Sequence, residues 1–307
     1  MKEFTISKKY ENKDVYSTLK KYFPHLATSA LNKVFRLKDV KVNDKRVNKD
    51  YILKENDVVK VYLNDNVLFG LPEKIQYEYE DDNILITYKP KGVVSNYEGN
   101  IKEKNTLAPY FDEMIKKEKG NDVIICHRLD TNTEGLVIFA KNKLAHEQIL
   151  EAFKNDYIHK EYVALVYGKL PKVQDTLSHY ILKDEKTGYS KIVEKSISNS
   201  KSCITEYTVI KYFKELNCSA ISIKLHTGRT HQIRAHMKYI GAPVIGDSKY
   251  ATNEINSKFK ATAQLLYAVK YTFNFPKESV LKYLNNIIID VKSDALDKIQ
   301  GIVNRIK

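Results

Sequence analysis

Residues 123–142, VIICHRLDTNTEGLVIFAKN, join two runs of apolar residues through a polar turn. The apolar runs are typical of buried β-strands, and the turn between them carries Asp130. A carboxylate in this position is displayed on a loop between two rigid strands. An Asp in a polar loop is usually a turn-former, because its side chain hydrogen-bonds the nearby backbone. The pattern therefore predicts the two strands and leaves the role of Asp130 open.

A second segment, LHTGRTHQIRAHMKYIGAPVIGDSKY at residues 225–250, predicts a helix that follows a strand. Alternating apolar residues precede a glycine turn, Thr230 is a suitable N-cap, and Gly241 is a suitable end of the helix. Arg234 then lies in the first helical turn, where a cation opposes the helix macrodipole. A compensating anion is expected there, and Asp130 is the candidate.

The histidines of this region, His226, His231 and His236, invite interpretation as a metal site. A separation of five residues turns successive helical side chains about 140° apart. No HExxH or Cys/His pattern accompanies them, and the sequence has no glycine-rich phosphate loop. We therefore predict no metal and no nucleotide cofactor.

The chain has 307 residues and a formal net charge of +13, from 51 Lys and Arg against 38 Asp and Glu. This excess favours a polyanionic partner, with nucleic acid ahead of an anionic membrane surface. No apolar run resembles a signal peptide or a membrane span, so a cytoplasmic protein is expected. The three cysteines have no CxxC spacing and are expected to be reduced and structural.

Residues 1–66 predict a small module of two helices and a hairpin. DVYSTLKKYF at 14–23 has apolar residues at helical spacing, with Asp14 as its N-cap and Pro24 as its stop. A second helix is predicted from Thr28. The module holds 15 Lys and Arg against 9 Asp and Glu, which is the sign expected for RNA.

The hairpin of this module is predicted at VKVNDKRV, where Asn43 and Asp44 supply the turn. Residues 67–76 contain Gly70 and Pro72 and lack periodicity, so they predict a linker. Beyond it, strands and helices alternate, which predicts a larger α+β domain at residues 77–307.

The two quoted segments carry a family resemblance. HRLDTNTEGLVIFAK resembles the HRLD-x-x-T-x-G-L-(apolar)-A-K motif of the RluA/RluD pseudouridine synthases, with Glu134 where a small residue is common. TGRTHQIRAHM with GAPVIGDSKY resembles that family's second signature. Three shorter matches surround Tyr162, Leu266 and the KPKG turn in residues 88–96. The first 66 residues resemble the RNA-binding module of ribosomal protein S-four.

The resemblance implies a pseudouridine synthase fold, α+β with a mixed, largely antiparallel central sheet. It implies catalysis by Asp130, Arg234 and Tyr162, in which Arg234 keeps Asp130 charged and oriented and Tyr162 lines the uracil pocket. Six further residues are implied in substrate binding, namely Arg128, Leu266, His127, Arg229, Thr230 and His231.

The implied reaction isomerises uridine in structured RNA without a cofactor. Large-subunit ribosomal RNA is the favoured substrate, transfer RNA is the alternative, and a monomer is expected. Asp130 could attack the ribose, attack the base or abstract a ribose proton. Two other classes stay open, a silent RNA-binding or ribosome-assembly factor and a hydrolytic glycosylase that releases free base.

Overall fold

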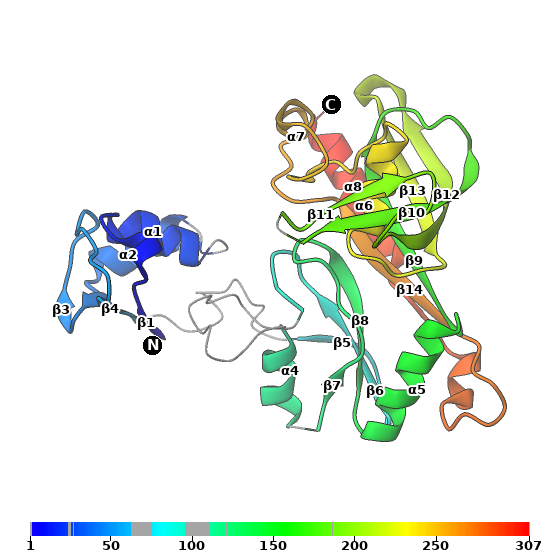
Figure 1. The fold of residues 1–307 in the computed structure, drawn as a ribbon, viewed down its shortest axis with the longest axis horizontal. Coiled ribbons are helices and arrows are strands. Elements are labelled where there is room, and N and C mark those ends of the chain that lie inside the picture. Colours follow the sequence, from blue (N-terminus) through cyan, green and yellow to red (C-terminus); the bar gives the residue numbers. More distant parts are fainter. Residues whose placement is uncertain are drawn as a thin grey trace. The chain divides into compact units, whose positions relative to one another are not determined.

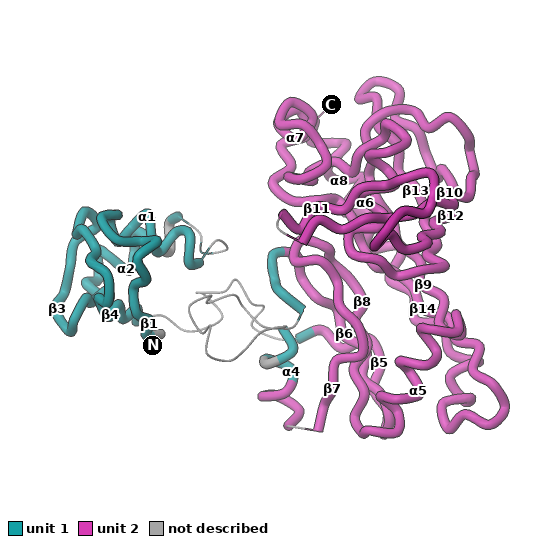
Figure 2. The backbone as a smooth tube through the Cα atoms, viewed as in Figure 1, with its two compact units in different colours: residues 1–75, 92–115 teal, residues 76–91, 116–307 magenta. Residues whose placement is uncertain are grey.

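The computed structural model describes residues 2–23, 26, 28–62, 75–95, 111–120, 122–185 and 187–306. The chain divides into two compact units, residues 1–75 with 92–115 and residues 76–91 with 116–307 (Figure 2). Most of the predicted linker at 67–76, and the predicted stop at Pro24, lie outside the described residues. The boundary of the amino-terminal module at residue 66 stays a prediction.

The amino-terminal unit contains a four-stranded antiparallel sheet with strand order β1-β4-β2-β3 (Figure 1). Its described elements are β1 (Lys2–Thr5), η1 (Lys8–Tyr10), α1 (Val15–Tyr22), α2 (Thr28–Arg36), β2 (Val40–Val42), β3 (Lys45–Arg46) and β4 (Val58–Val61). The helices and strands enclose one core that includes Leu19, Leu31, Val40 and Val59.

Local chemistry explains where these elements begin and turn. The side chain of Asp14 accepts a 2.7 Å hydrogen bond from the backbone N–H of Ser17, so it caps α1 as predicted. Between β2 and β3, Asn43 and Asp44 have φ angles of 49° and 64°. Two consecutive left-handed residues are the requirement of a type I′ hairpin turn, and the predicted turn is confirmed.

The larger unit is built around an 11-stranded sheet whose main order is β11-β10-β12-β13-β9-β14-β8-β6-β5 (Figure 1). Its described strands are β5 (Gln76–Glu80), β6 (Ile84–Lys89), β7 (Ile124–Ile125), β8 (Glu134–Ala140), β9 (Ile158–Tyr167), β10 (Gln174–Asp184), β11 (Tyr189–Val193), β12 (Lys201–Phe213), β13 (Cys218–Leu225), β14 (Leu266–Phe273) and β15 (Ile288–Asp290). Among these described strands, β14 pairs in parallel with β8 and the other pairings are antiparallel. The α+β class and the largely antiparallel sheet are confirmed.

Helices α5 (Lys143–Lys154), α6 (Gln232–Tyr239) and α8 (Lys292–Ile306) pack against this sheet. The other described helices are α4 (Phe111–Lys119), whose residues are divided between the two units, and α7 (Asn253–Lys258), with the short η3 (Lys214–Leu216) and η4 (Lys282–Asn286). Helix α5 contacts β8 and β9, α8 contacts β9 and β14, and α6 contacts β11 and β12. The side chains of Ile149 on α5 and Ile299 on α8 enter the same core cluster.

The parallel pairing of β8 with β14 depends on Gly135. This glycine has φ of +123°, and an added Cβ would collide with the backbone of Ala268 in β14. The motif glycine therefore allows the strand that follows Asp130 to approach the strand that begins at Leu266. No helix in the described part of the chain is long and apolar enough to cross a lipid bilayer.

Candidate active site

Asp130 lies in the turn between β7 and β8, and neighbouring elements hold this turn in place. The backbone N–H of Thr133 donates to the Asp130 carbonyl at 3.0 Å. The buried Thr133 hydroxyl accepts a 2.6 Å hydrogen bond from Gln264, just before β14. The Asp130 side chain keeps 27% of its surface exposed, so the carboxylate is accessible on a fixed turn.

Arg234 meets Asp130 from helix α6. Its Nη1 donates to Asp130 Oδ2 at 2.8 Å, so the structure brings the two residues together as the sequence analysis proposed. The predicted cap at Thr230 is wrong. The N-cap is His231, whose φ of 57° is left-handed and whose side chain makes no capping bond. Instead, the side chain of Gln232 accepts from the backbone N–H of Arg229 at 3.0 Å and closes the turn before the helix.

A second carboxylate, that of Asp247, fixes the other side of the Arg234 guanidinium. Nε of Arg234 donates to Asp247 Oδ2 at 2.6 Å, and Nη2 donates to Oδ1 at 2.9 Å. Asp247 has no exposed surface, and its Oδ1 also accepts from the backbone N–H groups of Lys249 and Tyr250. Burial opposes the charge of Arg234, but hydrogen bonding to Asp247 and the two carboxylate charges outweigh it and raise its pKa above the ordinary value.

Tyr250 covers one face of the Arg234 guanidinium, whose Cζ lies 5.0 Å from the ring centroid. The phenol oxygen is held by the backbone of Ser190, from which it accepts at 2.8 Å and to which it donates at 3.1 Å. The rings of Tyr189 and Tyr250 stack with their centroids 4.6 Å apart. Arg234 therefore has a single orientation set by groups on several elements.

Tyr162 and Leu266 lie on one face of the sheet. Tyr162 in β9 is opposite Ala268 in β14, and Leu266 is opposite Ala164. Directly opposite residues, and residues two apart in one strand, point to the same face. Burial, followed by the negative charge of Asp130, raises the pKa of Tyr162, so this residue stays a neutral phenol. Tyr162 is therefore near enough to Asp130 for the carboxylate charge to act on it, and Leu266 lies on the same face of the sheet as Tyr162.

Comparison with known proteins assigns this arrangement. The sequence profile described as RNA pseudouridylate synthase matches residues 83–239, which include Asp130, Tyr162 and Arg234. An uncharacterised RNA pseudouridine synthase of Mycoplasma capricolum subsp. capricolum is 33% identical over 97% of this chain and 100% of its own length. This chain belongs to the RNA pseudouridine synthase family. It is an isomerase that acts on RNA, and its motifs are those of the RluA/RluD type.

Two further relatives agree with this assignment. The ribosomal large subunit pseudouridine synthase C of Buchnera aphidicola subsp. Baizongia pistaciae is 30% identical over 95% of this chain and 94% of its own length. The structure of human RNA pseudouridylate synthase domain containing 1 aligns with a TM-score of 0.55 at 24% identity. That alignment covers 75% of this chain and 95% of the human chain, and it supports the fold.

The remaining predicted binding residues of the synthase differ in their surroundings. Arg128 and Thr230 are exposed, and Arg229 is exposed with its Nε donating to the Ser202 carbonyl at 3.1 Å. His231 is nearest to the catalytic carboxylate, with its Nε2 3.9 Å from Asp130 Oδ2. Burial lowers the pKa of His231. The positive charges of Arg234 and Lys249 lower it further, and the negative charge of Asp130 acts in the opposite direction.

His127 is tied into the protein. Its Nε2 accepts from the backbone N–H of Ile138 at 3.1 Å and lies 2.9 Å from the Tyr271 hydroxyl, while its ring packs against Phe153. Burial lowers the pKa of His127 to about 3, so the ring is neutral. These contacts indicate that His127 supports the strand after the catalytic turn, and its predicted contact with substrate has no support in this geometry.

The three histidines that invited a metal interpretation lie in separate environments. His226 is near Glu206, His231 is near Asp130, and His236 is within 2.7 Å of the Thr205 hydroxyl in the buried interior. Within the described residues, no group of three or more His, Cys, Asp or Glu side chains could hold a metal ion.

The sequence analysis assigned no role to Asp247 or to Lys89. Lys89 is the first lysine of the KPKG turn, it has no exposed surface, and its Nζ donates to the carbonyls of Pro90 at 2.9 Å and Thr131 at 3.1 Å. Burial lowers the pKa of Lys89 to about 7, although the charges of Asp130 and Glu134 act in the opposite direction. The ammonium group therefore sits beneath the catalytic turn at a cost in desolvation.

We predict that Asp247→Asn weakens both stability and catalysis. The substitution keeps the shape but removes one charge from a buried ion pair, and breaking such pairs costs on the order of 3–5 kcal/mol. Urea unfolding should show that loss, and turnover at saturating RNA should fall because Arg234 loses its fixed orientation. Glu147→Gln, in the exposed pair with Lys143, is the control and should behave like wild type. An Asp247→Asn enzyme with unchanged stability and turnover would show that Asp130 alone orients Arg234.

We also predict a pH-dependent stability difference between wild type and Lys89→Met. The folded pKa of about 7 lies below that of lysine in an unfolded chain. Between these values the unfolded chain binds more protons, so wild-type stability should rise with pH, by up to about 1.4 kcal/mol per pH unit. Urea unfolding at pH 6 to 9 measures the difference. Lys91→Met, at an exposed neighbour, should show no such slope, and a pH-independent difference for Lys89→Met would contradict the assignment.

Proposed function

We propose that this synthase isomerises specific uridines of large-subunit ribosomal RNA, with Asp130 as its catalytic carboxylate. The observation that supports this role most strongly is the 2.8 Å hydrogen bond from Arg234 to Asp130, with Arg234 itself fixed by buried Asp247. A preoriented carboxylate beside an apolar sheet face suits chemistry at the bond between a ribose and a pyrimidine base.

The reaction rearranges bonds within one nucleotide. The bond from ribose C1′ to uracil N1 breaks, the base rotates in the pocket, and C1′ joins uracil C5. The proton on C5 leaves, and N1 gains a proton, so the product is an isomer of equal mass. This series of reaction steps needs a carboxylate at the sugar and base. It also needs pocket walls that retain the detached uracil and groups that remove the proton from C5 and deliver one to N1.

The surroundings of Asp130 meet these needs. The ring of Tyr162 and the side chain of Leu266 offer a flat apolar contact for uracil on the sheet face beside Asp130. The neutral Tyr162 phenol can donate or accept a hydrogen bond near the migrating proton. Because a base must leave its stack to enter such a pocket, exposed Arg128 is well placed to hold the extruded nucleotide by its phosphate.

Ribosomal RNA is supported as the target by relatives named for it. The Buchnera aphidicola protein, named for the ribosomal large subunit, matches nearly the whole length of this chain. This extent favours large-subunit ribosomal RNA over transfer RNA. The cytoplasmic location and the monomeric state stay predictions.

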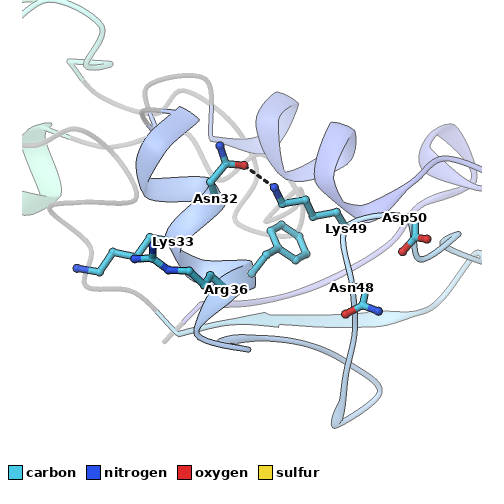
Figure 3. Close-up of a pocket in the computed structure, with 7 residues that line it drawn as sticks. Asn32, Lys33, Arg36, Asn48, Lys49 and Asp50 are labelled. Atoms are coloured by element: carbon cyan, nitrogen blue, oxygen red, sulfur yellow. Dashed lines mark hydrogen bonds between the residues drawn. The ribbon is translucent and has the colours of Figure 1, made fainter.

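The amino-terminal module adds a second contact with RNA. A cavity of about 560 Å³ lies between α2 and the loop after β3 (Figure 3). Lys33 and Arg36 project from the helix, and Lys49 approaches from the loop with its Nζ donating to Asn32 at 2.6 Å. Three cations and one carboxylate, Asp50, line this cavity, which suits an RNA phosphate backbone.

We predict that Asp130→Asn abolishes isomerisation while RNA binding persists, because the substitution removes the carboxylate charge and keeps its shape. Turnover should fall below about one tenth of wild type, as expected when a group that acts in the transition state is lost. Chromatography of digested RNA measures pseudouridine, and filter binding measures affinity. Asp297→Asn, at an exposed position of α8, is the control and should remain active.

The products of the wild-type enzyme decide among the alternatives. A free uracil product would identify a glycosylase, and RNA binding without any product would identify a silent RNA-binding factor. Comparing pseudouridine positions in ribosomal and transfer RNA from cells with and without the gene would identify the target, and a lost position in transfer RNA would contradict the ribosomal assignment.

For the amino-terminal module, we predict that the combined substitutions Lys33→Gln, Arg36→Gln and Lys49→Gln weaken RNA affinity and flatten its salt dependence. Each lost phosphate contact lowers the slope of log affinity against log salt by about 0.7 to 0.9. Turnover at saturating RNA should persist, because Asp130 is untouched. The control, Lys20→Gln with Lys21→Gln and Lys54→Gln, removes the same charge from exposed residues elsewhere in the module. Equal slopes for the two triple variants would exclude the cavity as an RNA contact.

A further inference from the structure

Lys160 lies on the face of the sheet that carries Tyr162. Strands β13 and β9 pair without a break in register, with Ile223 opposite Tyr162 and Leu225 opposite Lys160. Residues two apart in a strand point to the same face and are about 7 Å from each other. The side chain of Lys160 therefore stands beside that of Tyr162, on the face where we place the uracil.

Three segments surround the ammonium group of Lys160. Its Nζ lies 4.7 Å from the centroid of the Phe153 ring on α5. A Cβ added to Gly228, in the loop before α6, would be 3.6 Å from the same nitrogen. Burial lowers the pKa of His127, three residues before Asp130, and the charge of Lys160 lowers it further. The ammonium group is therefore close to α5, to the loop before α6 and to the segment that leads into the catalytic turn.

Within the described residues, Nζ of Lys160 makes no hydrogen bond and no ion pair. Burial lowers the pKa of this half-buried lysine, and the charge of Asp156 acts in the opposite direction. Asp156 is not within ion-pair distance of Nζ, and its carboxylate lies 3.8 Å from ring nitrogens of both His159 and His226. An ammonium group that is partly desolvated without an anion costs free energy, and a bound anion offsets that cost.

Gly228 leaves space beside this ammonium group. Its φ is outside the left-handed region that favours glycine, so the backbone conformation does not require a glycine here. A side chain at this position would instead occupy the space next to Nζ of Lys160. The following residues, Arg229 and Thr230, are exposed. The space beside Nζ therefore adjoins an exposed loop, from which a ligand can enter.

We propose that Lys160 binds a phosphate of the target nucleotide, the uridine whose base lies against Tyr162. This assignment rests on the proposed function, because a uridine held at Asp130 and Tyr162 brings its own phosphates to this face. Each phosphate is separated from the base by one ribose, which is the scale of the distance between the two strand positions. The phosphate is the anionic group of RNA, and the lysine ammonium binds it as a point charge.

The contact would hold the sugar and phosphate in place while the base detaches and turns. No bond of the phosphate changes in the reaction, so the contact is equally strong before and during the chemical step. Its loss is therefore expected to weaken RNA binding and to leave turnover at saturating RNA unchanged.

The first test compares full-length Lys160→Met with the control Lys169→Met. Methionine keeps an apolar stem beside Phe153 and removes the charge. Lys169 is exposed and follows the end of β9, so its substitution removes the same charge outside the site. The substrate is RNA extracted from cells that lack the gene, which contains the unmodified target. Initial rates of pseudouridine formation are measured at limiting and saturating RNA over a series of salt concentrations, and urea unfolding measures stability.

Lys160→Met should lose about tenfold or more of its rate at limiting RNA and keep its rate at saturating RNA. The slope of log affinity against log salt should be shallower by about 0.7 to 0.9, the contribution of one phosphate contact. The urea midpoint should not fall, because burial disfavours the charge that is removed. Lys169→Met should match wild type in every measurement.

Three results overturn the proposal. The first is equal behaviour of the two variants. The second is a loss of rate at saturating RNA with an unchanged salt slope, which would indicate that Lys160 acts on the uracil. The third is a lower urea midpoint with an unchanged salt slope, which would indicate that Lys160 only stabilises the fold.

RNA with a neutral linkage tests the same contact from the side of the substrate. Once the target uridine is located, short RNAs that contain it are made with an uncharged methylphosphonate on its 5′ or 3′ side and 2′-deoxy sugars next to the linkage. Matched RNAs have the same sugars and ordinary phosphates, and filter binding measures affinity. At one of the two positions the methylphosphonate should weaken binding to wild type and have little effect on Lys160→Met, because that contact is already lost. Equal effects on both enzymes at both positions overturn the proposal.

Failure of the proposed function is recognised separately. If wild type forms no pseudouridine on the extracted RNA, the proposed function fails, and filter binding of this RNA then decides the role of Lys160. A salt slope that is shallower for Lys160→Met than for Lys169→Met supports the phosphate contact, and equal slopes overturn it.

Discussion

The catalytic centre depends on one guanidinium that two carboxylates share. Arg234 is bound through Nε and Nη2 to Asp247, which has no exposed surface, and through Nη1 to Asp130, which is partly exposed. The buried pair fixes the plane of the guanidinium, and a planar donor array then fixes where an acceptor can lie. The exposed carboxylate is oriented because the buried one is anchored. The backbone donors of Lys249 and Tyr250 complete that anchor.

This interaction is possible because the sheet brings distant segments close together. The turn that carries Asp130 precedes β8, α6 follows β13, and Asp247 lies in the loop before α7. Close backbone approach at Gly135 and Gly246 places β8 beside β14 and the Asp247 loop beside Ala263. A side chain at either glycine would separate elements that the ion-pair network requires to be adjacent. Gly135 in the first long motif and Gly246 in the second are therefore packing requirements of the site.

The positive charge of this protein is a net excess over the whole chain and is also concentrated in local clusters of cations. The net charge of +13 attracts RNA without indicating where the strand runs. Two cavities concentrate cations, one between α2 and the loop after β3 and one between the ends of α7 and α8. Each cavity lies within one unit, and the first is the one that we propose as an RNA contact. The buried cation, Lys89, is tied instead to the catalytic turn, where its Nζ donates to the Thr131 carbonyl.

Sequence alone determined the elements and motifs that depend on near neighbours in the chain. The cap at Asp14, the hairpin turn at Asn43 and Asp44, and the strands around Asp130 all follow from interactions within a few residues. The pairing of Arg234 with Asp130 was also predicted, because a cation in the first turn of a helix calls for an anion.

Tertiary structure alone decided which groups hold the pair of Arg234 and Asp130, and which cations lie close to one another. Arg234 is 104 residues from Asp130 and 13 from Asp247, and Lys89 meets the Thr131 carbonyl 42 residues away. The cap of α6 was predicted at Thr230 and lies at His231, whose backbone is left-handed, while the side chain of Gln232 closes the turn before the helix. Composition reveals neither feature. Burial and long-range contact set the pKa of Lys89 and the orientation of Arg234, and neither quantity exists until distant segments pack together.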